Sequence, residues 1–376
     1  MLYFMLASMP VFVCGVLAMV LLLDQILWPQ RARKMMMIFM ISATLLYLGH
    51  CVYFLHETKL LPISDTIYCT CNPLVFPLYF LYIKSLTELR TPLWHVIILV
   101  LPAVVCGLAV GLAYWLTPND AVEAFIDQYL YHSPSIMNNA KADINALVFS
   151  HHLVKVVFSL EIIVILFLGI RRINRYHRLL EHYYSSPENK QLTWVKIMLI
   201  LFVVTSLNSI LYNVVGRHYF IGETSKLAIP SILYSTLLFA IGYIGLKQQG
   251  IERWKEEEAK PMTPPPSAVK LSDQIEQLMI KEKLYLNPQL KLSDLVMQLN
   301  SNRNYVYHAI NVEMGISFAE YVNRKRINHA EKLMKEFPKM PLSEIASRSG
   351  FASSTSFYRN FKTIRGCSPT KRKEKI

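Results

Sequence analysis

The stretch GFASSTSFYRNFKTIRGCSPTKRK, residues 350–373, stands near the end of a chain whose first two thirds are mostly apolar. It is basic and polar, with Phe357 and Phe361 four positions apart. Residues four apart lie on the same face of a helix, so this spacing predicts a short helix that buries one face. The segment therefore predicts a small helical domain joined to a chain of different character.

The same pattern occurs earlier in the chain. The pattern is apolar-x3-apolar-x4-Gly-x-Ser, where x is any residue. The first copy consists of Val306, Ile310, Gly315 and Ser317, and the second of Phe357, Phe361, Gly366 and Ser368. A short apolar helix and a tight turn precede each copy, in LSDLVMQLNSN and LSEIASRSGF. Asn300 and Gly350 stand in these turns, where both residue types tolerate positive φ. The pattern predicts two helix-turn-helix units.

Residues 316–336, ISFAEYVNRKRINHAEKLMKE, lie between the copies and predict a long amphipathic helix. Its expected inward residues are Phe318, Val322, Ala330, Leu333 and Met334. Arg324 and Lys325 are expected to face outward. A stiff connector of this kind lets two units reach successive major grooves on one face of DNA, about 34 Å apart.

Residues 271–376 resemble the DNA-binding domain of the AraC/XylS family. The residues that carry this resemblance are Ala346, Gly350-Phe351, Phe357, Arg359, Phe361-Lys362, Gly366 and Ser368-Pro369, with Arg326 and Ala330 in the connecting helix. The chain departs from the family at Arg372-Lys373, which replaces the usual aromatic-Arg ending, and at Tyr305, where a basic residue is common. The resemblance covers 106 of 376 residues and implies an all-helical domain that binds double-stranded promoter DNA. Bacterial members embedded in membranes are known as a class.

The second helix of each unit carries the predicted DNA contacts. In the first unit these are Arg303, Asn304, Tyr305, Tyr307, His308 and Asn311. In the second they are Ser353, Ser354, Ser356, Arg359 and Lys362. Asparagine suits adenine, arginine and lysine suit guanine or phosphate, and serines at a helix start suit phosphate. The alternative for either set is an ordinary solvated helix face.

Composition separates the chain into two parts. Of its 376 residues 53% are hydrophobic, yet its formal charge is +13. From Ser267 to the end there are nineteen Lys and Arg against ten Asp and Glu, a net charge of +9. The excess charge therefore belongs mostly to the last 110 residues, and the apolar character to the rest.

Seven stretches of the apolar part are long enough to cross about 30 Å of hydrocarbon as helices. They are residues 2–23, 35–55, 66–83, 94–116, 146–170, 197–215 and 228–246. The first lacks a basic start, and its apolar run is longer than that of a signal peptide, so we expect it to be retained as a span. The sequence thus predicts an all-α protein: a seven-helix transmembrane domain at 1–246 and a double helix-turn-helix domain at 271–376.

Loop charges predict the orientation of these spans. The loops after the first, third and fifth spans hold eleven Lys and Arg, and the alternate loops hold four. The first set is Arg31, Arg33, Lys34, Lys84, Arg90, Arg171, Arg172, Arg175, Arg178, Lys190 and Lys196; the second is Lys59, Lys141, Arg217 and Lys226. Basic loops stay in the cytoplasm, which places the N-terminus outside and the C-terminal domain inside a bacterial inner membrane.

Residues 247–270 join the two parts. The segment KQQGIERWKEEEAK is polar and PMTPPPS follows it, so a charged stretch and a semi-stiff spacer are expected. Fully extended, these 24 residues span roughly 80 Å. Such reach would let DNA dock without proteolytic release of the domain.

Cysteines and enzyme motifs give few functional indications. Cys69 and Cys71 form a C-x-C pair, which permits a disulfide or a soft metal, but without a second ligand pair apolar packing is favoured. No phosphate-binding loop, dinucleotide fingerprint, zinc-protease or nucleophile-elbow motif is present. The sequence therefore predicts a protein that is not an enzyme, with no catalytic residues, cofactor or metal.

Ionisable residues in the apolar part suggest where a signal is sensed. They are His50 in the second span and His151, His152, Lys155 and Glu161 in the fifth. We favour an end-of-span position near the membrane surface for the histidines, and a functional role for Lys155 and Glu161 over a structural interhelical pair.

The sequence supports the hypothesis of a membrane-embedded, one-component transcription regulator. Its expected partners are promoter DNA, membrane lipid and a ligand or signal at the membrane domain, with RNA polymerase and a second copy of the chain as further candidates. The basic tail TKRKEKI suits either DNA or anionic lipid. The alternatives are a transporter or membrane enzyme with a helical regulatory appendage, and a domain that acts only after cleavage.

Overall fold

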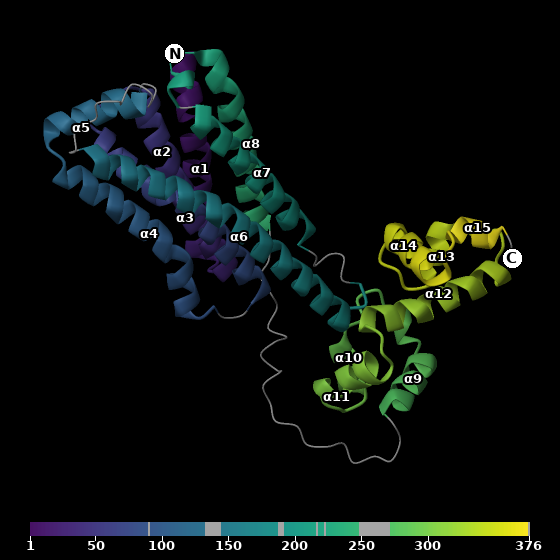
Figure 1. The fold of residues 1–376 in the computed structure, drawn as a ribbon. Coiled ribbons are helices and arrows are strands. Elements are labelled where there is room, and N and C mark those ends of the chain that lie inside the picture. The colour runs from purple at the N-terminus through teal and green to yellow at the C-terminus, as the bar shows by residue number, and fades with distance from the viewer. Residues whose placement is uncertain are drawn as a thin grey trace. The chain divides into compact units, whose positions relative to one another are not determined.

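The computed structural model describes residues 1–88, 91–131, 144–186, 192–215, 217–221, 223–247 and 271–374. Within these ranges the chain is helical, as the sequence predicts, and its one isolated β-bridge pairs Tyr184 with Lys291. The expected linker lies outside the described residues except for Lys247. Internal contacts divide the chain into two units (Figure 1): Met1–Ile173 with Thr193–Glu252, and Asn174–Leu192 with Arg253–Ile376.

The first unit is a bundle of long apolar helices. Its elements are α1 (Leu2–Leu27), α2 (Arg31–Phe54), α3 (Leu61–Thr87), α4 (Leu93–Leu116), α5 (Asn119–Phe125), the π-helix η1 (Ile126–Tyr131), α6 (Asn145–Tyr183), α7 (Thr193–Val215), the short η5 (Arg217–Phe220) and α8 (Thr224–Lys247). Among the described residues six helices, namely α1 to α4, α6 and α8, are long and apolar enough to cross a membrane. The remaining expected span, 197–215, falls in α7. Among the described residues only Thr193–Val204 of this helix forms an apolar stretch, which is shorter than a full span.

Helix α3 is the most enclosed element of the bundle. In its most apolar window 72% of the residues are buried, against 28% in α4. It packs against α2 on one side and α4 on another, which accounts for this burial. The outer helices expose large apolar side chains, such as Trp115 at 79% and Phe149 at 71%. An apolar outer surface of this kind suits a lipid environment.

The second unit consists of shorter helices, coloured green to yellow in Figure 1. They are α9 (Leu271–Lys281), η7 (Leu284–Leu286), α10 (Leu292–Gln298), α11 (Arg303–His308), the π-helix η8 (Ala309–Glu313), α12 (Phe318–Glu336), α13 (Leu342–Arg348), α14 (Ser354–Arg365) and α15 (Pro369–Lys373). The unit also includes Asn174–Leu192, and thus the last turns of α6.

The connecting helix α12 buries the side chains that its sequence pattern predicts. Phe318, Val322, Ala330, Leu333 and Met334 are all buried. The last three join Ile345, Phe357 and Phe361 in the core of the second helix-turn-helix. Arg324 is exposed as expected, whereas the side chain of Lys325 is only 21% exposed because it pairs with Glu276 of α9.

Two glycines of the second unit have positive φ in different surroundings. Gly350 has φ 85°, and a Cβ there would lie 2.5 Å from the carbonyl oxygen of Tyr285 and 2.7 Å from Cα of Leu286. Gly366 has φ 72°, and a Cβ there would meet no atom within 4 Å. Gly350 thus allows the turn before α14 to contact the η7 turn, whereas Gly366 supplies only the left-handed end of α14.

We therefore expect Gly350→Ala to destabilise residues 267–376 more than Gly366→Ala does. The Gly366→Ala variant should lose about 1–2 kcal/mol for a left-handed alanine. Gly350→Ala should lose about 1–3 kcal/mol more, because backbone must also move. Urea unfolding followed by circular dichroism checks this order, and equal losses would contradict the close contact.

Candidate nucleic-acid interface

The repeated pattern forms the same local structure twice. Its apolar positions, Val306 and Ile310 in the first copy and Phe357 and Phe361 in the second, are completely buried. Gly315 and Gly366 both have positive φ. The side chains of Ser317 and Ser368 both accept a hydrogen bond from a backbone N–H three residues on, and so cap α12 and α15. Each copy is therefore a helix anchored by two core residues, a left-handed turn and a capped next helix.

The turns before α11 and α14 also match their expected chemistry. Asn300 has φ 43° and Gly350 has φ 85°, so both adopt the left-handed conformation that the sequence predicts. The side chain of Asn302 accepts the N–H of Asn304, and that of Ser353 accepts the N–H of Ser356. These caps fix where the second helix of each unit begins.

Helix α14 presents most of its predicted contact residues to solvent. Ser353, Ser354, Arg359 and Lys362 are exposed. Ser356 is only 5% exposed, and its backbone carbonyl and hydroxyl accept hydrogen bonds from the Asn360 amide. The exposed serines lie at the start of the helix and the two cations on its later turns, a combination of hydroxyls and positive charge that suits an anionic ligand.

Helix α11 and the adjoining η8 are partly covered. Of their six predicted contacts only His308 is exposed, and Arg303, Asn304, Tyr305, Tyr307 and Asn311 are half-buried. The cover includes residues from the end of α6, which belong to the same unit. The Tyr183 ring lies 4.5 Å from the Arg303 guanidinium carbon and stacks on Tyr307 at 5.7 Å between ring centroids. His182 Nδ1 forms a hydrogen bond with Asn311 Oδ1.

A completely buried guanidinium, that of Arg326, joins the parts of the second unit. It donates to the carbonyl oxygens of Tyr285 and Asn287 at 2.7 and 2.8 Å. It also donates to Asn323 Oδ1 at 3.2 Å and to the hydroxyls of Ser185 and Ser186 at 3.1 and 3.2 Å. The guanidinium lies over the Phe351 ring, 5.7 Å from its centroid. One side chain thus contacts α12, the turn after η7, the second helix-turn-helix and the segment after α6.

Part of the positive charge in the second unit is neutralised internally. Glu331 of α12 binds Arg365 at 2.7 Å and Arg372 at 3.0 Å. Burial alone would raise the pKa of Glu331, but its bonds to these two arginines lower the pKa below its ordinary value. The carboxylate is therefore charged at neutral pH, and the two pairs weaken only as pH falls through that lowered value. Arg365 and Arg372 are consequently held toward protein.

The ionisable residues of the first unit lie in different surroundings. His151 is only 6% exposed and bonds to Asp65, and it lies near the start of α6. Its position near the membrane surface stays a prediction. His152 is exposed, and His50 is half-buried among aromatic rings, with Tyr68 4.8 Å away. Lys155 is exposed with its ammonium 6.0 Å from the Tyr129 ring centroid, and Glu161 Oε2 has no hydrogen-bond partner among the described residues.

A cavity of about 130 Å³ lies beside His50 in the first unit. Its lining is mainly aromatic and aliphatic, and its polar groups include Asn72, Ser231 and Tyr234. A small, mainly apolar pocket with few polar groups suits an apolar ligand or a lipid chain.

Sequence reasoning missed two groups of residues that the structure brings together. Asp65, Cys69 and His151 meet within the first unit, and their candidate ligand atoms all lie within 4.8 Å of one another. His182, Tyr183 and Ser185 meet the helix-turn-helix residues within the second. For the first group the sequence singles out Cys69 and His151 separately, and the four-residue spacing of Asp65 and Cys69 places these two on one helix face.

Comparison with known proteins identifies the C-terminal region. Residues 295–375 match the family described as "Helix-turn-helix domain". The Msm operon regulatory protein of Streptococcus mutans is 32% identical over 87 residues, which are 23% of this chain and 31% of that protein. The probable transcriptional regulator LumQ of Photobacterium leiognathi is 35% identical over 91 residues, 23% of this chain and 36% of its own. The uncharacterized HTH-type transcriptional regulator YtdP of Bacillus subtilis is 32% identical over 125 residues, which are 31% of this chain and 16% of that protein.

These similarities are confined to part of each protein. The chain spans about a third or less of the length of two of these relatives, and 36% of the third. No solved structure matches the chain. The matched residues hold both copies of the repeated pattern and the connector α12 between them. Residues 295–375 therefore match a helix-turn-helix domain, in the region that carries the AraC/XylS resemblance of the sequence.

Proposed function

We propose that this protein is a membrane-embedded, one-component transcription regulator that binds promoter DNA through two helix-turn-helix units. The observation that carries the proposal is the duplicated, capped and glycine-terminated helix pattern within the family match. Two relatives named as transcriptional regulators match 31% and 23% of this chain. The function assigned to them is thus extended here from the shared domain to the whole protein.

The length of α12 supports simultaneous use of both units. Its 19 residues span about 28 Å at 1.5 Å per residue. Successive major grooves on one face of DNA are about 34 Å apart. A stiff connector of nearly that length suits second helices that enter adjacent grooves.

We assign the DNA contacts to the residues that the sequence predicts. On α14 the direct contacts are Ser353, Ser354, Arg359 and Lys362, which are exposed, with Ser356 at the buried edge of that helix. On α11 and η8 they are Arg303, Asn304, Tyr305, Tyr307, His308 and Asn311. Three of these, Arg303, Tyr307 and Asn311, need the covering α6 residues to move aside. The second helix-turn-helix is then the one that engages DNA without rearrangement.

The contents of the second unit support a cytoplasmic C-terminal domain. This unit contains both Asn174–Leu192, which lies between α6 and α7, and the C-terminal helices, which follow α8. Both segments must lie on the same side of a membrane, so α7 and α8 together must cross it an even number of times. Two crossings satisfy this requirement, and the basic residues of the loop between α6 and α7 favour the cytoplasmic side.

Arg359→Ala should weaken DNA binding by the full-length protein in lipid nanodiscs. We expect about a 10-fold loss of affinity for upstream DNA and a decrease of about one in the slope of log affinity against log salt. Arg365→Ala is the matched control, because Arg365 lies on the same helix but binds Glu331 and Asn328. Fluorescence anisotropy over a salt series measures both quantities. Equal effects of the two substitutions would contradict the contact assignment.

A topology reporter fused after Ile376 tests the proposed orientation. A fluorescent protein that matures only in the cytoplasm should be bright there, and a phosphatase that folds only in the periplasm should be inactive. The same reporters fused before Met1 should give the opposite result, because seven crossings separate the ends. Phosphatase activity at the C-terminal end would exclude DNA binding by the intact protein.

A further inference from the structure

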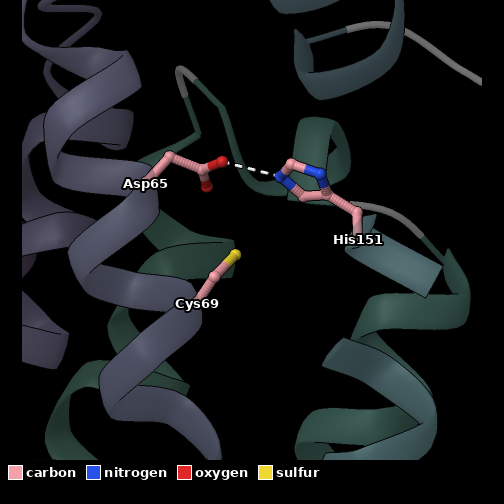
Figure 2. Close-up of side chains that lie close together, drawn as sticks. All are labelled: Asp65, Cys69 and His151. Carbon is pink, nitrogen blue, oxygen red and sulfur yellow. Dashed lines mark hydrogen bonds and ion pairs between the residues drawn. The ribbon is translucent and has the colours of Figure 1, made fainter. Parts of the chain in front are cut away.

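Three ligand-type side chains converge inside the first unit, at the beginning of two helices. Asp65 and Cys69 stand one turn apart on α3, and His151 lies near the start of α6. All three are buried, with exposed fractions of 4%, 1% and 6%. Figure 2 shows the carboxylate, the thiol and the imidazole directed at one another across the space between the helices. Such a group is built by tertiary packing and not by a local motif.

Hydrogen bonds fix the orientation of the His151 ring. Its Nδ1 lies 2.7 Å from the carbonyl oxygen of Leu147, one turn earlier on α6, so Nδ1 carries a proton and donates it. Its Nε2 then faces Asp65 Oδ2 at 2.7 Å. The Tyr114 hydroxyl donates to the same carboxylate oxygen at 2.9 Å. This is the arrangement usual around a metal-bound histidine: one ring nitrogen bonds a backbone carbonyl and the other faces the metal position.

We propose that Asp65, Cys69 and His151 bind a divalent transition-metal ion, with Zn²⁺ as the best fit. The set offers one carboxylate oxygen, one imidazole nitrogen and one sulfur, which Zn²⁺ accepts together and Mg²⁺ and Ca²⁺ do not. The metal replaces the proton of the Cys69 thiol and the proton between Nε2 and Asp65, and both leave to solvent. Three protein ligands leave a fourth tetrahedral position for water or another ligand.

Only small movements are needed to form the site. Ligand atoms around tetrahedral Zn²⁺ lie roughly 3.3–3.7 Å apart, given bond lengths of about 2.0–2.3 Å. The contact between His151 Nε2 and Asp65 Oδ2 must therefore lengthen from 2.7 Å, and the widest ligand separation must shorten from up to 4.8 Å. Changes of about 1 Å lie within the reach of side-chain rotations on two helices. Metal binding then joins α3 to α6 in place of a hydrogen bond.

The test uses full-length protein without a polyhistidine tag, purified in detergent and freed of metal by a chelator. Co²⁺ is added as a spectroscopic probe and Zn²⁺ is measured by competition. We expect one Co²⁺ per chain with a thiolate-to-metal absorption band. Cys69→Ser should abolish the band, and Cys69→Ser, Asp65→Asn and His151→Gln should each weaken Zn²⁺ binding at least about 100-fold.

Cys71→Ser is the matched control. Cys71 is as buried as Cys69, but two residues along a helix it points roughly 200° away. It should leave the absorption band and the Zn²⁺ affinity unchanged, and the far-ultraviolet circular dichroism of each variant confirms that its helices persist. Absence of a thiolate band in the wild type, equal losses in both cysteine variants, or undiminished binding in Asp65→Asn would overturn the assignment. None of these readouts depends on DNA.

A separate observation concerns the second unit, where residues 182–186 at the end of α6 lie against the first helix-turn-helix. We call these residues the α6-end segment. Its Tyr183 covers Arg303 and Tyr307, and its His182 binds Asn311. The backbone N–H and the hydroxyl of Ser185 both donate to the Leu290 carbonyl oxygen, at 3.1 and 2.8 Å. The covered side chains are three of the six residues assigned to DNA contact in that unit.

We infer that Tyr183 and His182 of the α6-end segment block the first helix-turn-helix and must move off it before both units can bind DNA. This inference rests on the proposed DNA contacts of α11. An aromatic ring stacked on arginine and tyrosine, and a hydrogen bond on asparagine, occupy the groups that would otherwise meet bases and phosphates. DNA and these two side chains therefore compete for one surface, and their displacement raises affinity.

Tyr183→Ala and Tyr183→Phe separate this competition from general effects in the full-length protein. The alanine variant removes the ring, whereas phenylalanine keeps its stacking on Arg303 and Tyr307. We expect about a 10-fold gain in DNA affinity for alanine and little change for phenylalanine. Hydrogen exchange should also become faster across residues 303–311 in the alanine variant only, with residues 354–365 as an internal control.

The two readouts distinguish failure of this inference from failure of the proposed function. Unchanged exchange and affinity in Tyr183→Ala would overturn the inference while DNA binding stands. If Tyr183→Ala exchanges faster but neither the wild type nor any variant binds DNA, the contact of Tyr183 is supported and the proposed function is refuted. If Tyr183→Ala also loses protection at residues 354–365, His182→Ala supplies the same comparison with a smaller change. Unchanged exchange at residues 303–311 in His182→Ala would then refute the contact.

Discussion

The second unit depends on the buried guanidinium of Arg326. A charge removed from water is stable only if its donors all find acceptors, and here five neutral oxygens and an aromatic face surround it. These oxygens belong to α12, to η7 with the residue that follows it, and to residues 185–186. Satisfying one side chain therefore fixes three pieces of chain. The contact of Gly350 with Tyr285 and Leu286 brings the second helix-turn-helix to the same place. Polar satisfaction, more than apolar burial, sets the arrangement of these elements.

Local features of the fold were predictable from sequence, because they follow from residue type and spacing. The duplicated anchors Val306 and Phe357, the left-handed Asn300 and Gly350, and the inward face of α12 all appear as expected. The helix boundaries also agree with the expected spans to within five residues, since length and apolarity decide them, except at the end of α6, which continues from residue 170 to Tyr183. Lys325 shows the limit of such prediction. Its place in the helical pattern predicts a solvent-exposed side chain, yet Glu276 from α9 pairs with it and partly covers it.

Contacts between residues distant in sequence were not predictable. His151 looks like an end-of-span histidine, and only the packing of α3 against α6 shows that Asp65 faces it. Tyr183 lies in a stretch that the sequence predicts to be a basic loop and that carries no motif. Nothing in the spacing of α11 indicates that an aromatic ring covers Arg303. Exposure of the predicted DNA contacts likewise depends on such packing, so α14 and α11 differ although their sequence pattern is the same.

Helix α6 connects the two inferences physically. It carries His151 near its start, in the first unit, and Tyr183 as its last residue, in the second. To shift the populations of two conformational states from 1:99 to 99:1, a ligand must bind one state about 5.5 kcal/mol more strongly than the other. Structural Zn²⁺ sites supply about 10–16 kcal/mol in small domains, so a metal that binds only one packing of α3 against α6 has ample energy to bias that helix. The contacts of Tyr183 and His182 with the first helix-turn-helix consist of ring stacking and a hydrogen bond, interactions of about 1 kcal/mol each. The binding energy of such a metal site is therefore larger than that of these two contacts, which is the order of strengths that a switch requires.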